Sequence, residues 1–409
     1  MPPASLPEGL SLQQFERRPS LVALSVPCRE VGQVLRHPDL APVLFKQRGV
    51  KNVVDDPGGD KGRRLVLLGE KVQGQLEEVL PAAAWDFIRE RVAAGQVEIT
   101  SHQVVVGYEQ LSVEEALACV LPAGVEVPTS FETIGHIAHF NLRAVHEPYK
   151  ESIGRIVLDK NKNIRTVVNK LSELSNEFRT FDMEVLAGER RFATSVKEQG
   201  MTFDLDYSEV YWNSKLSAER QRVFKQLAGG QVVVDMFAGI GAMSCFAATA
   251  GCRVHSNDLN PHGAHWQRVN VNKNQLDAQV QVHNLDARDF VRHLAAAEGM
   301  FASARSAVAH VIMNLPELAL DFLDVFHGVC APDQSPGPTR IHCYCFARQS
   351  PPDAEIRPRI EAALGEVPPD LCIVHVRDVA PKKIMYCVEC ELPLGILRGT
   401  TNKRRKVAD

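Results

Sequence analysis

The sequence predicts an α/β protein whose C-terminal part is a mostly parallel sheet with helices on both faces and an antiparallel last strand. Strand-like runs alternate with helical stretches after residue 230, beginning with QVVVDMF and CRVHSND, and this alternation is typical of a parallel sheet. A glycine turn, AGIG, follows the first of these strands. The short segment APKKI separates the last two strands, which indicates a hairpin.

Two smaller α+β domains are expected before this sheet, which gives predicted domains at residues 1–96, 97–200 and 201–409. The chain has 409 residues, and single hydrophobic cores stop growing near ~250–300 residues. The first domain combines a strand-like run, SLVALSVP, with helical stretches such as KVQGQLEEVL. The second begins with the strand-like EITSHQVVVG and continues into a helix capped by Ser112, with Glu115 three residues later.

Composition excludes several classes of protein. The formal net charge is −4, so the chain is not a basic nucleic-acid coat, and RNA binding requires a local basic patch. Residues 150–170 supply one, with six Lys or Arg against two acids, so we expect the middle domain to contact RNA phosphates. No apolar run reaches the ~18–20 residues that a membrane span needs, so no membrane partner is expected.

Cysteine usage and the N-terminal residues indicate a compartment. The ten cysteines are scattered, and the first twenty residues lack the apolar core of a secretory signal. We therefore expect reduced thiols in an intracellular protein of the cytoplasm or nucleus, with the mitochondrial matrix as an alternative.

The glycine turn in residues 232–244, VVVDMFAGIGAMS, indicates a nucleotide-like cofactor of one of two classes. A dinucleotide fingerprint requires G-x-G-x-x-G, but here Ser244 stands at the third glycine position after Gly239 and Gly241. An acid at the strand end followed by Phe237 and the two glycines suits S-adenosylmethionine better. The glycine pair alone leaves both classes open.

Polar residues at the ends of the next three strands discriminate between these classes. Asp258 ends the second strand, 19 residues after Gly239, where an acid accepts hydrogen bonds from ribose hydroxyls in either class. Asp286 follows the third strand and can accept from an adenine amino group. The fourth strand ends in MNLPELA, where the Asn-x-Pro turn at Asn314 and Pro316 is typical of methyltransferases that act on amino groups or ring nitrogens. A helix cap is the ordinary explanation of any one of these acids, but their order favours a cofactor site.

Seven ordered motifs resemble the archaeal and eukaryotic tRNA (guanine-N1)-methyltransferases that modify guanosine at tRNA position 37. The similarity covers roughly residues 97–393 well and the first domain weakly. The motifs are FETIGHIAHFNLR, IGRIVLDKNKNIRTVVNK, EFRTFDMEVLAGE, FDLDYSEVYWNSKLSAER, VVVDMFAGIGAMS, NDLNPHGAHWQRVNVNKN and MNLPELA.

This resemblance implies an architecture, a cofactor and a partner. The last domain would be a class I Rossmann-like methyltransferase domain that uses S-adenosylmethionine and no metal. The first domain would contact the outer corner of tRNA, the middle domain would bind RNA, and the protein would act as a monomer on tRNA with guanosine at position 37.

The resemblance also implies roles for individual residues. N1 of neutral guanine carries a proton, so a base must remove it while a cation or donor stabilises charge on O6. Glu219 matches the family's base, Arg179 the arginine that faces O6, and Asn314 a residue that holds both base and cofactor. Tyr211 and Pro316 match target-pocket residues. The matching cofactor contacts are Arg220, Asp258, Leu259, Asp286, Ala287 and Asn314, beside Phe237, Gly239 and Gly241 of the glycine turn.

Ordinary structural roles compete with these assignments. Glu219 could be an acid stabilised at a helix start, and Arg179 could pair with Asp182 or Glu184 on the surface. His136 and His139 have the i, i+3 spacing of a helical metal pair, and packing or RNA contact is the preferred interpretation. The close cysteine pairs, in RIHCYCF and IMYCVECEL, lie in strand-like runs and are interpreted as packing residues rather than zinc ligands.

Three other functions remain as alternatives. A sister family in wybutosine synthesis transfers the aminocarboxypropyl group of S-adenosylmethionine and needs no base for guanine N1, so the pair of Arg179 and Glu219 favours methyl transfer. A catalytically inactive tRNA-binding protein would be expected to have lost part of the site. A dehydrogenase is opposed by Ser244 and by the sequence NLP.

Overall fold

A computed structural model describes residues 11–171, 182–297, 299–301, 308–334, 337–348 and 351–400. The chain forms two compact units. Unit 1 comprises Met1–Glu132, Ala138–Asn169 and Glu184–Glu189, and unit 2 comprises Thr133–Ile137, Lys170–Met183 and Arg190–Asp409. The division of the chain into domains at residues 96 and 200 stays a prediction. Arg179 lies outside the described residues.

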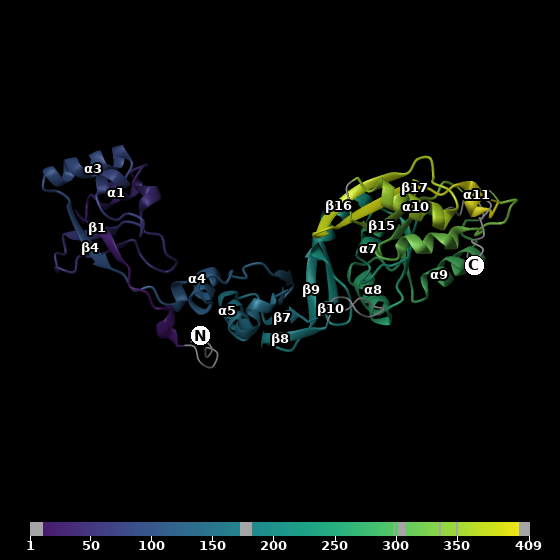
Figure 1. Cartoon of the computed structure of the whole chain (residues 1–409), viewed down its shortest axis with the longest axis horizontal. Coiled ribbons are helices and arrows are strands. Elements are labelled where there is room, and N and C mark those ends of the chain that lie inside the picture. The colour runs from purple at the N-terminus through teal and green to yellow at the C-terminus, as the bar shows by residue number, and fades with distance from the viewer. Residues whose placement is uncertain are drawn as a thin grey trace. The chain divides into compact units, whose positions relative to one another are not determined.

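The N-terminal part of unit 1 is an antiparallel sheet in the order β2-β3-β1-β4 (Figure 1). The expected strand SLVALSVP forms its long inner strand, β1, whereas the helix expected over KVQGQLEEVL is reduced to one turn, α2. The elements are η1 (Leu12–Phe15), β1 (Ser20–Pro27), α1 (Val31–Arg36), η2 (Ala41–Val43), β2 (Val53–Asp55), β3 (Arg63–Leu67), α2 (Leu76–Val79), α3 (Ala82–Ala93) and β4 (Glu98–Gln103).

The segment from β4 to β8, most of which lies in unit 1, confirms the predicted helix cap. Ser112 accepts a hydrogen bond from the backbone amide of Glu115, and the Glu115 side chain accepts one from the Ser112 amide, so the capping box begins α4 as predicted. The elements that follow β4 as far as β8 are η3 (Tyr108–Gln110), α4 (Val113–Val120), β5 (Glu132–Ile134), β6 (Ile137–Phe140), η4 (Ala144–Tyr149), α5 (Lys150–Lys160), β7 (Thr166–Lys170) and β8 (Met183–Gly188), and the sheet order is β5-β6-β7-β8.

The segment that contains His136 and His139 is not helical. Strands β5 and β6 are neighbours in one sheet, and Gly135 between them has φ +57°, so the i, i+3 spacing does not bring the two imidazoles onto one helix face. The basic segment, residues 150–170, spans α5 and β7. Several of its cations face partners within unit 1: Lys150 pairs with Glu147 and Glu184, and Arg155 with Asp159.

The part of unit 2 that starts at Arg190 opens with an antiparallel hairpin of β9 (Ala193–Glu198) and β10 (Met201–Asp206), which turns at Gln199 and Gly200. The strand β9 was not expected separately. The outer edge of β10 is satisfied by asparagine amides of α8 (Pro261–Lys273): Asn270 bonds both the amide and the carbonyl of Asp204, and Asn274 does the same for Thr202. These amides attach the hairpin to α8.

The main sheet of unit 2 has the order β13-β12-β11-β14-β15-β17-β16 (Figure 1). Strands β11 to β15 are parallel to their neighbours, and β17 is antiparallel to both β15 and β16, which confirms the prediction of an antiparallel last strand. The strands are β11 (Val232–Asp235), β12 (Arg253–Asn257), β13 (Val280–His283), β14 (Val308–Met313), β15 (Arg340–Ala347), β16 (Cys372–Ala380) and β17 (Lys383–Glu391).

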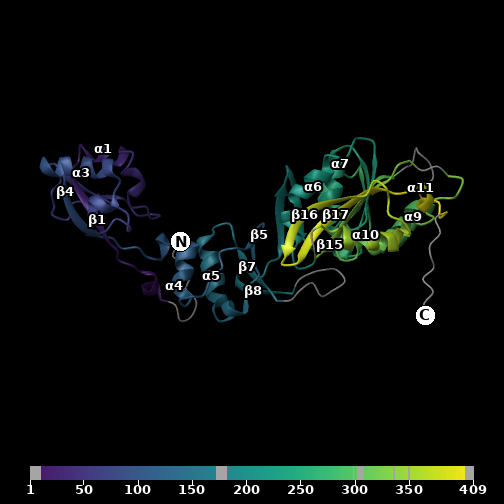
Figure 2. The same ribbon diagram turned by 45° about the horizontal axis from the view of Figure 1, so that its top comes forward.

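Helices cover both faces of this sheet. α6, α7 and α8 pack with one another, as do α9, η6 and α10, and Figure 2 shows α6 and α7 on the opposite side of the strands from α9 and α10. The connection between β14 and β15 is the 3-10 helix η6 rather than an α-helix. The helices are η5 (Ser214–Leu216), α6 (Ser217–Phe224), α7 (Ala242–Thr249), α8, α9 (Ala287–Ala297), η6 (Ala319–Phe326), α10 (Asp353–Leu364) and α11 (Leu394–Leu397).

Successive side chains of β15 and β17 point to opposite faces of the sheet, so these strands have one apolar and one polar face. Ile341, Cys343 and Cys345 of β15 join the hydrophobic core that includes α9, η6 and α10, and so do Val388 and Cys390 of β17. All four cysteines of these two strands, Cys343, Cys345, Cys387 and Cys390, are fully buried. Among the described residues, no helix combines the length and the apolar character that crossing a membrane requires.

Candidate cofactor and catalytic site

The glycine turn between β11 and α7 is the first part of the site. Gly239 and Gly241 have φ of +57° and +86°, a left-handed conformation that side chains other than glycine rarely adopt. The Gly239 amide donates a hydrogen bond to Oδ2 of Asp258 at 2.7 Å, so the turn is fastened to the end of β12. Gly263 lies against both groups, since a Cβ there would come within 3.1 Å of the Gly239 carbonyl oxygen.

Asparagine side chains join the ends of the three neighbouring strands. Asn257 donates to the carbonyls of Met236 and Leu285 and accepts from the Leu285 amide. Asn284 donates to the carbonyls of Asp258 and Leu259. The polar tips that the sequence places after separate strands therefore lie at one edge of the sheet, as predicted for the carboxyl ends of parallel strands.

Asp258 is held as a hydrogen-bond acceptor at this edge. Burial raises the pKa of its carboxyl to about 6, while the amides of Asn260 and Gly239 act in the opposite direction by donating to it. Asp286 is exposed and caps the start of α9 by accepting from the Arg288 amide, and Ala287 begins that helix as a buried residue. The capping role of Asp286, expected as the ordinary alternative, is thus present in the structure.

The strand ends provide the surfaces that an adenosyl group needs. Leu259 and Leu285 are 41% and 37% exposed although both are large apolar side chains, and they flank Asp258 and Asp286 in the sequence. Phe237 packs partly buried against Phe322 below the turn. Backbone amides at a glycine turn, a carboxylate at a strand end and exposed apolar side chains are a set of groups that fits S-adenosylmethionine.

The Asn-x-Pro turn lies beside β15. The carbonyl of Pro316 accepts a hydrogen bond from the Phe346 amide at 3.2 Å, so the turn continues the strand pairing of β14 and β15. Asn314 is partly exposed, and within the described part of the chain its side chain makes no hydrogen bond. Its amide is therefore available to a ligand at the sheet edge.

Tyr211 and Arg220 lie in the segment that precedes β11 and the glycine turn. The Tyr211 ring is exposed, its hydroxyl accepts from Asn213, and its carbonyl lies 3.9 Å from where a Cβ of Gly239 would stand. Arg220 makes a buried two-pronged ion pair with Glu198, at 2.9 and 2.6 Å, and its guanidinium lies over the Trp212 ring. A hollow of about 280 Å³ in unit 2 is lined by both Glu198 and Trp212.

Glu219 is buried and fully hydrogen-bonded. It is 8% exposed, and Arg222 donates to both of its carboxylate oxygens at 2.8 Å. The Tyr344 hydroxyl donates to Oε1 at 2.9 Å. An acid stabilised only by the helix dipole would not require these two partners. The structure therefore places the predicted base in a specific hydrogen-bonded environment.

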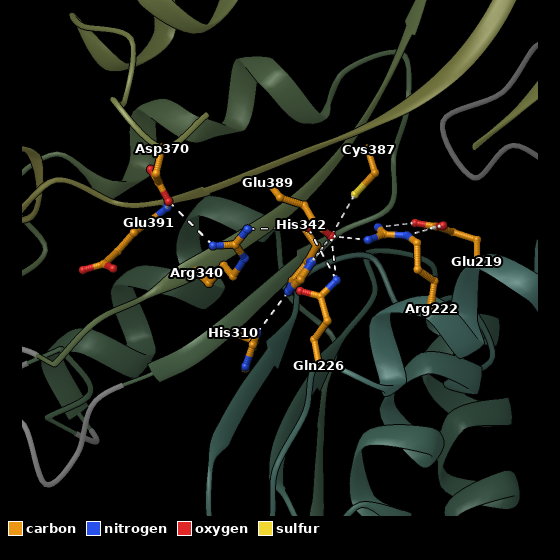
Figure 3. Close-up of polar contacts among 10 residues, drawn as sticks. All are labelled: Glu219, Arg222, Gln226, His310, Arg340, His342, Asp370, Cys387, Glu389 and Glu391. Carbon is orange, nitrogen blue, oxygen red and sulfur yellow. Dashed lines mark hydrogen bonds and ion pairs between the residues drawn. The ribbon is translucent and has the colours of Figure 1, made fainter. Parts of the chain in front are cut away.

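A chain of buried polar groups continues from Arg222, and sequence reasoning missed it (Figure 3). Arg222 also contacts Glu389 at 2.7 Å, Glu389 contacts Nδ1 of His342 at 2.9 Å, and Nε2 of His342 contacts His310 at 3.0 Å. Burial opposes ionisation of Glu389, but hydrogen bonds from His342 and Arg222 outweigh it and lower the pKa to about 2. Charged and polar residues at alternate positions of β15, beginning with Arg340, were the available signal.

The fold and the site define a class of protein, the Rossmann-like S-adenosylmethionine-dependent methyltransferases. Residues 194–350 match the family model described as the TRM5/TYW2 methyltransferase domain, and residues 113–191 match the TYW2 N-terminal domain. A tRNA (guanine(37)-N(1))-methyltransferase of Phytophthora infestans is 37% identical over 96% of both chains. One of Danio rerio is 37% identical over 98% of this chain and 85% of its own length. The chain belongs to the tRNA (guanine(37)-N(1))-methyltransferase family.

A solved structure agrees on the fold. The crystal structure of wild-type Trm5b from Pyrococcus abyssi aligns with a TM-score of 0.61 and 23% identity, over 90% of this chain and 98% of that one.

Proposed function

We propose that this protein transfers the methyl group of S-adenosylmethionine to N1 of guanosine 37 in tRNA. The observation that carries the proposal is the 37% identity to a relative of that name over 96% of both chains. The strand-end site supports it, because Asp258 fastens a glycine turn beside exposed apolar side chains and the Asn314 amide.

The chemistry requires a base. When bound, S-adenosylmethionine supplies an electrophilic methyl group. Glu219 would accept the proton of guanine N1, so that the N–H bond breaks and the freed electron pair attacks the methyl carbon. The Glu219 carboxylate is the proton acceptor in this step, and the Arg222 guanidinium donates to both of its oxygens.

Other residues would hold the guanine. The Tyr211 ring is exposed and its backbone carbonyl lies next to the glycine turn, while Pro316 fixes the Asn-x-Pro turn, so we place a flipped base in contact with the Tyr211 ring and the Asn314 amide. Arg179 is proposed to stabilise charge on O6, in accordance with the family resemblance. The buried pairing of Arg220 with Glu198 suggests an indirect role, in which the pair shapes the wall of the 280 Å³ hollow.

In accordance with the family resemblance, we propose that the protein acts as a monomer. Sedimentation of the purified protein with and without tRNA would test this, since a dimer in both samples would contradict it.

A second candidate function has one observation in its favour. Residues 113–191 match the TYW2 N-terminal domain, so transfer of the aminocarboxypropyl group must be distinguished from transfer of the methyl group. Both reactions use the same cofactor, and the modified nucleoside distinguishes them.

The replacement Glu219→Gln tests the proposed base. We expect S-adenosylmethionine affinity, measured by calorimetry, to stay within about twofold, while the single-turnover methylation rate falls by about 10²–10⁴, the usual contribution of a general base. The control is Glu361→Gln, which changes an exposed glutamate of α10. A wild-type rate in Glu219→Gln would remove Glu219 from the mechanism.

A further inference from the structure

The proposed base is held by two partners on different elements. Glu219 and Arg222 lie three residues apart on α6, so both side chains project from the same face of the helix. Tyr344 reaches the same carboxylate from β15 in the sheet below. Glu219 is therefore fixed by contacts within its helix and by a contact across to the sheet.

Arg222 is itself shared between two carboxylates. Its Nε and NH2 groups face Glu219, and its NH1 group contacts Glu389 on β17 at 2.7 Å. Glu389 also accepts from Gln226 and from His342. Arg222 would thus keep an anionic partner when Glu219 takes up a proton or turns toward the guanine, so it would not become a buried unpaired charge.

The other titratable groups around Glu219 are neutral or more distant. Burial raises the pKa of the Tyr344 hydroxyl and of the Cys387 thiol well above their ordinary values, so both stay protonated near pH 7. Arg340 lies 3.6 Å from Glu389 rather than beside Glu219. The titratable groups that connect to Glu219 directly or through Arg222 and Glu389 are Arg222 on α6, His310 on β14, Arg340, His342 and Tyr344 on β15, and Cys387 and Glu389 on β17.

A metal ion is a poor alternative occupant. Ligand atoms of His342, Cys387 and Glu389 lie within 4.8 Å of one another, but Glu389 already faces Arg222, and both ring nitrogens of His342 are hydrogen-bonded. A cation there would have to displace a guanidinium of the same charge. The contacts are those of a closed hydrogen-bonded network.

We propose that Arg222 and Tyr344 are positioning residues for Glu219, and that Glu389, supported by His342, sets how strongly Arg222 holds it. This inference rests on the proposed function. Arg222 and Tyr344 hold the Glu219 carboxylate in one orientation before guanine arrives. Glu389 competes for the same guanidinium and so limits how tightly Arg222 pairs with Glu219.

The test is the pH dependence of single-turnover methylation of a tRNA transcript with guanosine 37. Removing the cation in Arg222→Gln should move the rise in rate to higher pH by about 1–3 units, the usual effect of losing an adjacent opposite charge. Tyr344→Phe, an isosteric change, should move it in the same direction by a smaller amount. Arg222→Lys should restore part of the wild-type position.

Glu389→Gln should move the rise in rate to lower pH, because Arg222 then forms an ion pair with Glu219 alone. A shift of opposite sign between Arg222→Gln and Glu389→Gln is a result that a general loss of structure would not give. Curves that coincide with wild type in all variants, or that only scale down at every pH, would overturn the inference. Because Tyr344→Phe keeps the shape of the side chain, an unshifted curve in that variant counts against the inference even where Arg222→Gln fails to fold.

The wild-type curve separates this inference from the function on which it rests. If the wild-type protein forms no N1-methylguanosine, the proposed function fails. If it forms that product but the variants leave the position of the rise unchanged, the positioning role alone fails.

Discussion

At the scale of single residues, Ser244 shows why the glycine turn departs from the dinucleotide pattern. Its hydroxyl donates to Asp235 at 2.8 Å and bonds Ser256 at 2.7 Å. The Ser256 hydroxyl donates to the side-chain oxygen of Gln267, and the Gln267 amide nitrogen donates to the Gly239 carbonyl. These side chains join the end of β11 to the carbonyl of the turn. A glycine in place of Ser244 would break this buried chain of hydrogen bonds.

The buried acid at the start of that chain is unusual. Burial raises the pKa of Asp235 to about 7, although the Ser244 hydroxyl opposes the shift. The nearby carboxylate of Asp258 acts in the same direction as burial, so both acids of the turn are coupled by charge. Cofactor binding at the turn would therefore act on two carboxylates at once.

Asp258→Asn should weaken S-adenosylmethionine binding by about 10–100-fold, because hydrogen bonds to a charged group contribute roughly 1.5–3 kcal/mol. Asparagine keeps the size of the side chain but cannot accept from both the Gly239 and Asn260 amides through equivalent oxygens. Calorimetry measures the affinity, and Asp289→Asn, an exposed acid in the first turn of α9, is the matched control. Equal affinities in wild type and Asp258→Asn would exclude the carboxylate from the cofactor site.

At the scale of elements, local patterns predicted the sheet and failed where pairing is non-local. The alternation of strands and helices and the short APKKI connection predicted β11 to β17, including the antiparallel β17. The separate strand β9 was missed because its sequence, ATSVKE, is mostly polar and only partly buried. Helical spacing at His136 was misleading because two short strands flank a glycine there.

The candidate site was predictable to a similar extent. Strand-end residues such as Asp258 have a positional signal, because carboxyl ends of parallel strands meet at one edge. Tyr344, which contacts Glu219, and Glu389, which contacts Arg222, have none, because both lie more than a hundred residues away and reach α6 only through the order of strands in the sheet. Such contacts follow from topology rather than from spacing.

The main sheet should lose stability as the pH falls from 7 toward 5. Burial lowers the pKa of His255 and of His310 to about 4, below the ordinary value of 6.5. Between these values the unfolded chain binds protons that the folded chain does not, so stability rises with pH across this window. Each histidine should lower the free energy of unfolding by on the order of 2 kcal/mol at pH 5 relative to pH 7.

Urea unfolding at the two pH values measures this effect. His255→Gln and His310→Gln should each reduce the difference between pH 5 and pH 7, whereas His375→Gln, on the exposed part of β16, should leave it unchanged. Equal unfolding midpoints of the wild-type protein at both pH values would contradict the assignment of neutral buried imidazoles.

At the scale of the whole molecule, an acidic chain must bind an acidic partner through local charge. The net charge is −4, and in the basic segment, residues 150–170, Lys150 and Arg155 already pair with acids. Lys162 and Arg165 are exposed within that segment. These two side chains are the better candidates for contact with tRNA phosphates.

Binding of tRNA should therefore weaken steeply as salt concentration rises. The double variant Lys162→Ala/Arg165→Ala should reduce the slope of log affinity against log salt by about 1.4–1.8, if each cation neutralises one phosphate. The control is Arg292→Ala/Arg357→Ala, which changes two exposed arginines that pair on their own helices in unit 2. An unchanged slope in the first variant would remove the basic segment from the interface.

The most direct measurement of the central claim is the identity of the modified nucleoside. The purified protein is incubated with labelled S-adenosylmethionine and two unmodified tRNA transcripts, one with guanosine and one with adenosine at position 37, and the RNA is then digested. We expect N1-methylguanosine from the first transcript alone. An aminocarboxypropyl product, or methylation of both transcripts, would contradict the proposed function.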